Sequence, residues 1–208
     1  MVSIGAVVEH VEVQKLLSDL YERVSGFQVG SNEYQMIREK GGDPTYGELT
    51  LGGMNTLVEE LKLQKNDVFY DLGSGVGKMP VYIYLTTPVK KAVGIELSPT
   101  RHAHAIKVKK SLEKKGMLDS ARALNFLEKS MLDENLSDAT IIYMSSTCFS
   151  DELMKSITDK LTRENTNPLK ILTLKKLPDN TVFQLTKTLS LPMTWSDNVR
   201  AYLYERSA

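Results

Sequence analysis

The chain contains little that would cross-link it, anchor it in a membrane or export it. Cys148 is the single cysteine among 208 residues, so an internal disulfide is excluded and a reducing compartment is favoured. No apolar run approaches the roughly 18 residues of a transmembrane helix. The first residues lack the charged region and the long apolar core of a signal peptide. The sequence therefore predicts an intracellular protein with no membrane partner.

An excess of charge of either sign is also missing. Lys and Arg together number 26, as do Asp and Glu, so the whole chain exerts no net attraction on nucleic acid. One stretch is locally basic, with Arg101, His102, His104, Lys107, Lys109, Lys110, Lys114 and Lys115. Either a solvated helix face or a nucleic-acid contact explains this helix. Because His102 and His104 would point to different faces of a helix, no metal site is expected.

Apolar periodicity predicts alternating helices and strands. Helices are expected over 6–24, 33–40 and 50–63, directly after the glycines of 73–77, and over 99–115 and 151–163. Strands are expected over 67–72, 91–96, 123–128, 140–146 and 170–177, followed by a hairpin of 182–191 and 199–204 that turns at 196–198. Ser98 is the expected N-cap of its helix, with Pro99 at the first helical position.

This alternation predicts an α/β fold with a seven-strand, mostly parallel sheet and a C-terminal antiparallel hairpin. The ligand of such a sheet binds at the carboxyl ends of its strands. Residues 1–45 are expected to form an N-terminal helical extension, and residues 46–208 the main domain.

The most informative stretch is Asp-Leu-Gly-Ser-Gly-Val-Gly over 71–77. Glycines allow a ligand to approach the backbone closely, because they lack a Cβ. Glu96 ends the next expected strand, where an acid accepts hydrogen bonds from ribose hydroxyls. The dinucleotide pattern G-x-G-x-x-G does not fit, because its third glycine would fall on Lys78 or on Pro80. The loop therefore predicts a nucleotide-type ligand of another kind.

An acid directly before a G-x-G-x-G loop resembles the first motif of the class I S-adenosylmethionine methyltransferases. Together with Tyr46-Gly47-Glu48 ahead of the loop and Trp195 near the end, it resembles the disruptor-of-telomeric-silencing family. The members of that family are the non-SET histone-lysine methyltransferases, which have a Rossmann-like fold. The likeness covers residues 44 to 206.

The resemblance implies S-adenosylmethionine as the cofactor and protein-lysine methylation as the reaction. The expected cofactor-binding residues are Tyr46, Asp71, Gly73, Ser74, Gly75, Gly77, Lys78, Glu96, Leu97 and Ser145. The expected catalytic residues are Tyr46, Glu48, Ser145, Phe149, Trp195 and Tyr202. A lysine acceptor must first lose a proton, and a dry channel lined by aromatic rings favours its neutral amine by desolvation.

The chain departs from the family pattern at positions that concern the substrate. Lys78 replaces a glutamine, Ser145-Ser146 replaces an asparagine pair, and Ala201 stands where the family has a tyrosine. The family's basic nucleosome-binding tail is absent. The resemblance to the family therefore predicts the cofactor of this chain better than it predicts the substrate.

The expected partner is a protein substrate, a core histone or nucleosome, with nucleic acid contacted through residues 101–115. A histone substrate would place the protein in the nucleus, and another substrate in the cytoplasm. Two alternatives remain open, namely a methyltransferase for RNA or a small molecule, and a non-catalytic binding module with the same fold.

Overall fold

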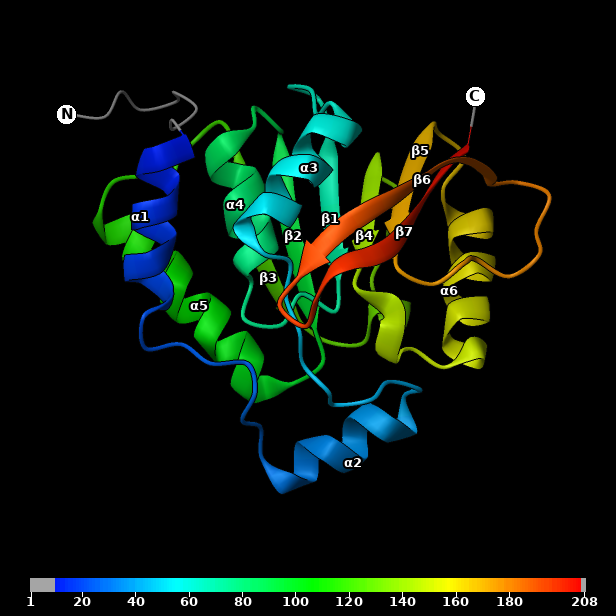
Figure 1. The fold of residues 1–208 in the computed structure, drawn as a ribbon, viewed down its shortest axis with the longest axis horizontal. Helices are drawn as coiled ribbons and strands as arrows, with labels where there is room; N and C mark the ends of the chain where they lie inside the picture. Colours follow the sequence, from blue (N-terminus) through cyan, green and yellow to red (C-terminus); the bar gives the residue numbers. More distant parts are fainter. Residues whose placement is uncertain (1–9, 207–208) are drawn as a thin grey trace.

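The computed structural model describes residues 10–206, so the expected helical residues 6–9 lie outside the described part. A seven-stranded sheet of order β3-β2-β1-β4-β5-β7-β6 forms the centre of the molecule (Figure 1). The parallel strands are β1 (Val68–Leu72), β2 (Lys91–Glu96), β3 (Ala123–Glu128), β4 (Ile141–Met144) and β5 (Leu169–Thr173). Strands β6 (Gln184–Met193) and β7 (Ser196–Arg206) form the antiparallel hairpin. The predicted fold class is confirmed.

Six α-helices and two short 3₁₀ helices are described. They are α1 (His10–Tyr21), α2 (Ser31–Glu39), α3 (Leu51–Leu61), α4 (Lys78–Thr86), α5 (Pro99–Lys114), α6 (Asp151–Glu164), η1 (Met131–Asp133) and η2 (Ser146–Cys148). The predicted N-cap is confirmed, because the Ser98 hydroxyl accepts a hydrogen bond from the Arg101 N–H at 3.1 Å. No helix within residues 10–206 is long and apolar enough to cross a membrane.

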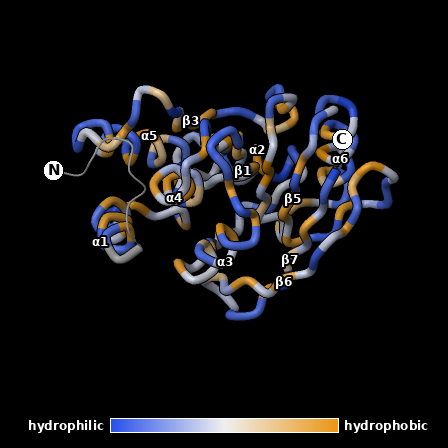
Figure 2. The backbone as a smooth tube through the Cα atoms, turned by 90° about the horizontal axis from the view of Figure 1, so that it is seen from above, coloured by the Kyte–Doolittle hydropathy of each residue, from blue (hydrophilic) through white to orange (hydrophobic). Residues whose placement is uncertain are grey.

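Alternation along the strands divides the apolar core into two layers. On β1, Val68, Tyr70 and Leu72 pack on the α6 side of the sheet, whereas Phe69 packs on the side of α3, α4 and α5. Helix α1 adds a third layer by packing on α4 and α5. It lies at one end of the molecule and α6 at the other (Figure 2). The apolar core therefore reaches into the expected N-terminal extension.

Several helix and strand ends differ from the sequence-based expectation, and three of these differences have an identifiable cause. Strand β4 ends at Met144 because Ser146 begins η2, and β5 ends at Thr173 because the Ser146 hydroxyl accepts the N–H groups of the next two residues. The hairpin turns at 194–195 rather than at 196–198. The backbone N–H of Thr194 donates to the Glu48 carbonyl at 2.8 Å, which fixes the turn by a contact from far away in the sequence.

The glycine at the start of α4 generates a test of the packing. Gly77 has a φ of +81°, and a Cβ there would lie 2.5 Å from the Phe126 ring. Gly116 has a φ of +65°, but a Cβ there would meet no neighbouring atom within 4 Å. In urea denaturation, Gly116→Ala should lose about 1 kcal/mol from backbone strain. Gly77→Ala should lose about 3 kcal/mol, because overpacking is added. Equal losses would contradict a tight contact between α4 and β3.

Candidate functional site

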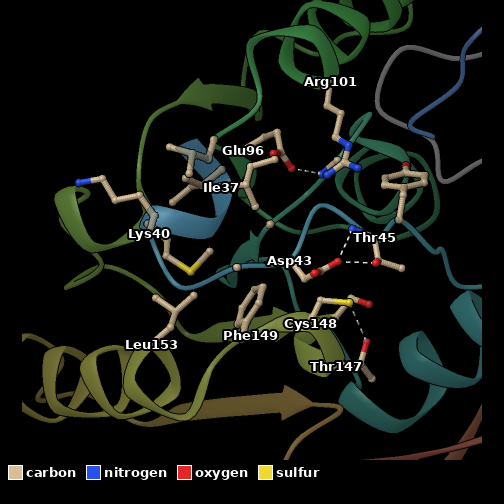
Figure 3. A pocket seen from close by; sticks show the side chains of 18 of the residues that line it. Ile37, Lys40, Asp43, Thr45, Glu96, Arg101, Thr147, Cys148, Phe149 and Leu153 are labelled. Carbon is tan, nitrogen blue, oxygen red and sulfur yellow. Dashed lines mark hydrogen bonds between the residues drawn. The ribbon is translucent and has the colours of Figure 1, made fainter. Parts of the chain in front are cut away.

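The expected site residues gather at the carboxyl ends of β1, β2 and β4, where a cavity of about 300 Å³ opens (Figure 3). Its expected members are Tyr46, Gly73, Gly75, Glu96, Leu97, Ser145, Phe149 and Trp195. A smaller cavity adjoins it and adds Glu48, Asp71, Ser74 and Lys78. The structure therefore brings together residues from five separate stretches of the chain.

Two expected residues are not among those lining either cavity. Gly77 is the N-cap of α4, and its backbone packs against Phe126 and Ala105. Tyr202 lies on β7, paired with Thr173, and its ring packs beside Lys176. Both residues contribute to the structure around the cavities rather than to their walls.

Glu96 connects the glycine loop to the end of β2. Its side chain is 6% exposed, and its two oxygens accept the backbone N–H of Gly75 at 2.7 Å and of Ser98 at 2.8 Å. A carboxylate has about four acceptor positions. Since these bonds use two of them, Glu96 keeps acceptor capacity toward the larger cavity that it lines.

Asp71 is buried beside Glu96 without comparable partners. It is 3% exposed, and its Oδ1 has no hydrogen-bond partner among the described residues. Burial, followed by the nearby Glu96 carboxylate, raises the pKa of Asp71 well above its usual range. The Ser74 hydroxyl is likewise buried without a partner in the described chain. Buried polar atoms of this kind are rare unless a ligand satisfies them, so Asp71 and Ser74 fit a ligand that carries hydrogen-bond donors.

The segment Tyr46-Gly47-Glu48 covers the glycine loop. A Cβ on Gly75 would lie 2.6 Å from the Tyr46 ring, so this close approach requires glycine. The Tyr46 hydroxyl donates to Glu48 at 2.5 Å, and Lys78 forms an ion pair with the same carboxylate. Burial and the neighbouring Glu48 raise the pKa of Tyr46 well above its usual value, so its phenol stays protonated.

The tip of the β6–β7 hairpin holds the same segment from the other side. The Trp195 ring lies against Gly47 so closely that a Cβ on this glycine would overlap it. The Thr194 hydroxyl accepts the Glu48 N–H at 3.1 Å, and Leu49 forms a bridge with Met193. Trp195 itself is 47% exposed. It therefore forms part of the cavity rim.

The two serines after β4 have different surroundings. Ser146 is fully buried, and its hydroxyl lies 2.6 Å from that of Thr173, so it fixes the turn after β5. Ser145 lines both cavities. Phe149 follows η2, and its ring packs against Gly73 of the glycine loop. Ser145 and Phe149 thus line the same larger cavity as Glu96.

Arg101 was expected on a basic helix face, and this placement is wrong. Its side chain is 6% exposed and lines the larger cavity. It donates to the carbonyls of Gly26 at 2.9 Å and Pro44 at 2.6 Å, and its guanidinium lies 4.7 Å from the centre of the Tyr46 ring. No local sequence pattern distinguishes it from the exposed cations that follow. The basic face is therefore reduced to Lys107, Lys110, Lys114 and Lys115, which are exposed.

The donor set suits an organic ligand. Within residues 10–206 there is no group of three or more His, Cys, Asp or Glu residues arranged to hold a metal ion. The larger cavity combines apolar walls from Ile37, Met131 and Leu153 with the acceptor oxygens of Glu96. The smaller one is lined both by Asp71 and by a cation, Lys78. A nucleoside that carries an amino-acid group has the matching chemistry, with ribose hydroxyls, an ammonium and a carboxylate.

Comparisons with known proteins show which family the chain resembles. The family described as histone methylation protein DOT1 matches residues 31–207. An H3 lysine-79 specific histone-lysine N-methyltransferase of Caenorhabditis elegans is 30% identical over 144 residues, 65% of this chain and 15% of the relative. A protein-lysine N-methyltransferase of Saccharolobus islandicus is 28% identical over 104 residues, 50% of this chain and 61% of the relative. The chain therefore spans less than two thirds of these curated relatives.

Solved structures share the fold at low sequence identity. An RNA methyltransferase from Salinibacter ruber, in complex with S-adenosyl-L-homocysteine, has a TM-score of 0.56 and 17% identity, covering 74% of this chain and 90% of its own. A SAM-dependent methyltransferase from Aquifex aeolicus has a TM-score of 0.52 and 10% identity, covering 85% of this chain and 97% of its own. At such identities the likeness concerns the fold alone.

The raised pKa of Asp71 generates a prediction about stability and pH. The folded state holds the Asp71 proton more tightly than the unfolded state does, and this tighter binding stabilises the fold. The stabilisation is complete at pH values below the unfolded pKa of about 3.9. It is lost as pH rises through the folded pKa. The Asp71→Asn variant lacks this loss. Its free energy of unfolding relative to wild type should therefore increase as the pH is raised from about 4 in chemical denaturation.

The control for this measurement is Asp179→Asn, which changes an exposed aspartate. Its difference from wild type should stay constant over the same pH range. A constant difference for Asp71→Asn as well would contradict the assignment of a buried, proton-retaining carboxyl to this position.

Proposed function

Because the chain belongs to the histone methylation protein DOT1 family, we propose that it transfers a methyl group from S-adenosylmethionine to the side-chain amine of a lysine in a protein. The observation that carries the proposal is the pair of buried carboxyl groups at the glycine loop. Glu96 keeps acceptor capacity, and Asp71 has an oxygen without a partner in the described chain. These are the acceptors that ribose hydroxyls and an ammonium group require.

Each part of the site has a proposed role in holding this cofactor. Glu96 accepts hydrogen bonds from the ribose hydroxyls, and Asp71 accepts them from the α-ammonium group. Lys78 and Ser74, which line the same small cavity, face the amino-acid end. Leu97, on the wall of the larger cavity, contributes apolar surface for the base. The bound cofactor supplies a methyl group that is already activated on a sulfonium.

The remaining task of the protein is to position and desolvate the acceptor. Holding two reactants in line removes much of the barrier to their reaction. A free lysine amine has a pKa of about 10.4, and an apolar environment lowers it toward the neutral, nucleophilic form. Phe149, Trp195 and Tyr46 supply such an environment at the cavity. Glu48 is engaged by Lys78 and Tyr46, so its proposed role is to position Tyr46.

A core histone is the proposed substrate, and the nucleus the proposed compartment. Four relatives, from Caenorhabditis elegans, Emericella nidulans, Aspergillus fumigatus and Eremothecium gossypii, are named as H3 lysine-79 specific histone-lysine N-methyltransferases. The exposed lysines of α5 provide a surface for nucleic acid, although the neutral overall charge keeps this contribution small. The proposal therefore centres on the histone itself, with nucleosomal DNA as a secondary contact.

Mass spectrometry of acceptors incubated with the protein and S-adenosylmethionine tests this function. Core histones, free and in nucleosomes, should acquire methyl-lysine. Trp195→Ala should lower the yield about tenfold, equivalent to about 1.4 kcal/mol, because it removes an aromatic wall at the cavity rim. Its cofactor affinity should change less than this yield.

The matched control is Leu185→Ala. Leu185 is 46% exposed, comparable with Trp195, and lies on β6 of the same hairpin, but it is not among the residues lining either cavity. This variant should keep the wild-type yield. Methyl groups that appear only on RNA or on small molecules would refute the lysine acceptor and leave the cofactor assignment intact.

A further inference from the structure

Helix α2 covers the larger cavity but is weakly connected to the apolar core. Ile37 is its single buried residue, and no residue of α2 belongs to either of the two core clusters of the described chain. Ile37 and the following Lys40, Gly42 and Asp43 nevertheless line the cavity (Figure 3). Segments with few buried apolar contacts open at low free energy. Other interactions must therefore keep α2 in place.

A single buried side chain joins the two ends of the segment that contains α2. The Arg101 guanidinium donates from Nε to the Gly26 carbonyl at 2.9 Å and from Nη2 to the Pro44 carbonyl at 2.6 Å. Hydrogen bonds from a charged donor are stronger than neutral ones, and a buried donor without its partner is destabilising. Arg101 thus closes residues 26–44 into a loop that is fixed to the first turn of α5.

The same guanidinium is in contact with the residue that covers the glycine loop. It lies 4.7 Å from the centre of the Tyr46 ring, within the range of a cation–π interaction. The Tyr46 ring in turn packs on Gly75, and its hydroxyl accepts the Val76 N–H at 3.5 Å. A continuous series of contacts therefore leads from Arg101 through Tyr46 to the loop at the end of β1.

Glu33 provides a second anchor, independent of Arg101. Its carboxylate accepts the hydroxyls of Ser98 and Thr100 and the Thr100 N–H at 3.3 Å, at the start of α5. Although burial opposes it, these hydrogen bonds prevail and lower the pKa of Glu33. A carboxylate at a helix N-terminus is also favoured by the helix dipole. These two side-chain anchors of α2 are polar and lie on the first turn of α5, the helix that follows Glu96. Backbone hydrogen bonds also hold the end of the segment, from the Asp43 N–H to the Cys148 carbonyl at 2.8 Å and from the Ser150 N–H to the Gly41 carbonyl at 2.7 Å.

We infer that Arg101 is a positioning residue that keeps residues 26–46 closed over the cofactor cavity and holds Tyr46 against Gly75. The inference rests on the proposed function for the identity of the cofactor. Arg101 acts through the segment and through Tyr46. Its loss should therefore open residues 26–46 and weaken cofactor retention while the sheet stays folded, because within this segment only the partly buried Tyr46 packs against an apolar core cluster.

The chain offers a matched control in Arg122. Its guanidinium also donates from Nε and Nη2 to backbone carbonyls, those of Val89, Tyr84 and Thr87, and it also lies over a tyrosine ring, 4.4 Å from the centre of Tyr84. Arg122 precedes β3, and it is not among the residues lining either cavity. The two arginines therefore have the same chemistry in different places.

The test compares Arg101→Gln, Arg101→Lys and Arg122→Gln with wild type. Hydrogen exchange is followed peptide by peptide, and the affinity for S-adenosylhomocysteine is measured by calorimetry. Arg101→Gln should exchange about tenfold faster in residues 26–46, with β1, β2 and β4 unchanged, and should bind about tenfold more weakly. Arg101→Lys keeps the charge but lacks the planar guanidinium with its several donors. Its exchange rate in residues 26–46 and its affinity should therefore lie between those of wild type and Arg101→Gln. Arg122→Gln should lower global stability but preserve the relative protection of residues 26–46 and the affinity.

Three results would overturn the inference. The first is faster hydrogen exchange throughout the sheet in Arg101→Gln, which would show that Arg101 stabilises the whole fold rather than residues 26–46. The second is an open segment with unchanged cofactor affinity, and the third is an unchanged segment. If wild type binds neither S-adenosylmethionine nor S-adenosylhomocysteine, the proposed function fails, and the exchange data alone decide whether Arg101 holds residues 26–46.

Discussion

Two carboxyl groups buried side by side at the ends of β1 and β2 impose the main constraint on this structure. A buried charge is costly unless hydrogen bonds compensate for it. Glu96 receives two backbone N–H groups, one from Gly75 of the glycine loop and one from Ser98 at the start of α5, and so joins these two segments. Asp71 receives no such compensation at Oδ1 within the described residues. This asymmetry leaves an acceptor available in the cavity, which a sheet selected for stability alone would not retain.

The walls around these acids come from distant parts of the chain and meet through glycine. Gly75 admits the Tyr46 ring, and Gly47 admits Trp195. A side chain at either position would separate the segment 46–48 from the glycine loop or from the hairpin tip. Polar contacts then hold the segment 46–48 in place, through the ion pair of Lys78 with Glu48 on one side and through Arg101 against Tyr46 on the other. A rigid apolar sheet thus carries a cavity whose cover is held mainly by polar contacts.

The sequence reveals most of the fold and a large part of the site. Apolar periodicity predicts every strand of the sheet, and Ser98-Pro99 predicts the start of α5, because these signals are local. The glycine loop and Glu96 are recognisable because their spacing reflects consecutive parallel strands. The turn at 194–195 and the end of β5 depend on Glu48 and Ser146. The role of Arg101 depends on carbonyls far away in the sequence, so no local pattern contains it.

The assignment of the cavity to S-adenosylmethionine depends most directly on Glu96, and calorimetric titration of wild type and Glu96→Ala tests it. A charge-assisted hydrogen bond contributes about 1.5–3 kcal/mol, and about 1.4 kcal/mol corresponds to a tenfold change in affinity. Wild type should bind S-adenosylmethionine, and Glu96→Ala should bind it at least about tenfold more weakly while remaining folded. Nicotinamide dinucleotides should not bind. Equal affinities of the two proteins, or binding of a nicotinamide dinucleotide in place of S-adenosylmethionine, would contradict the assignment.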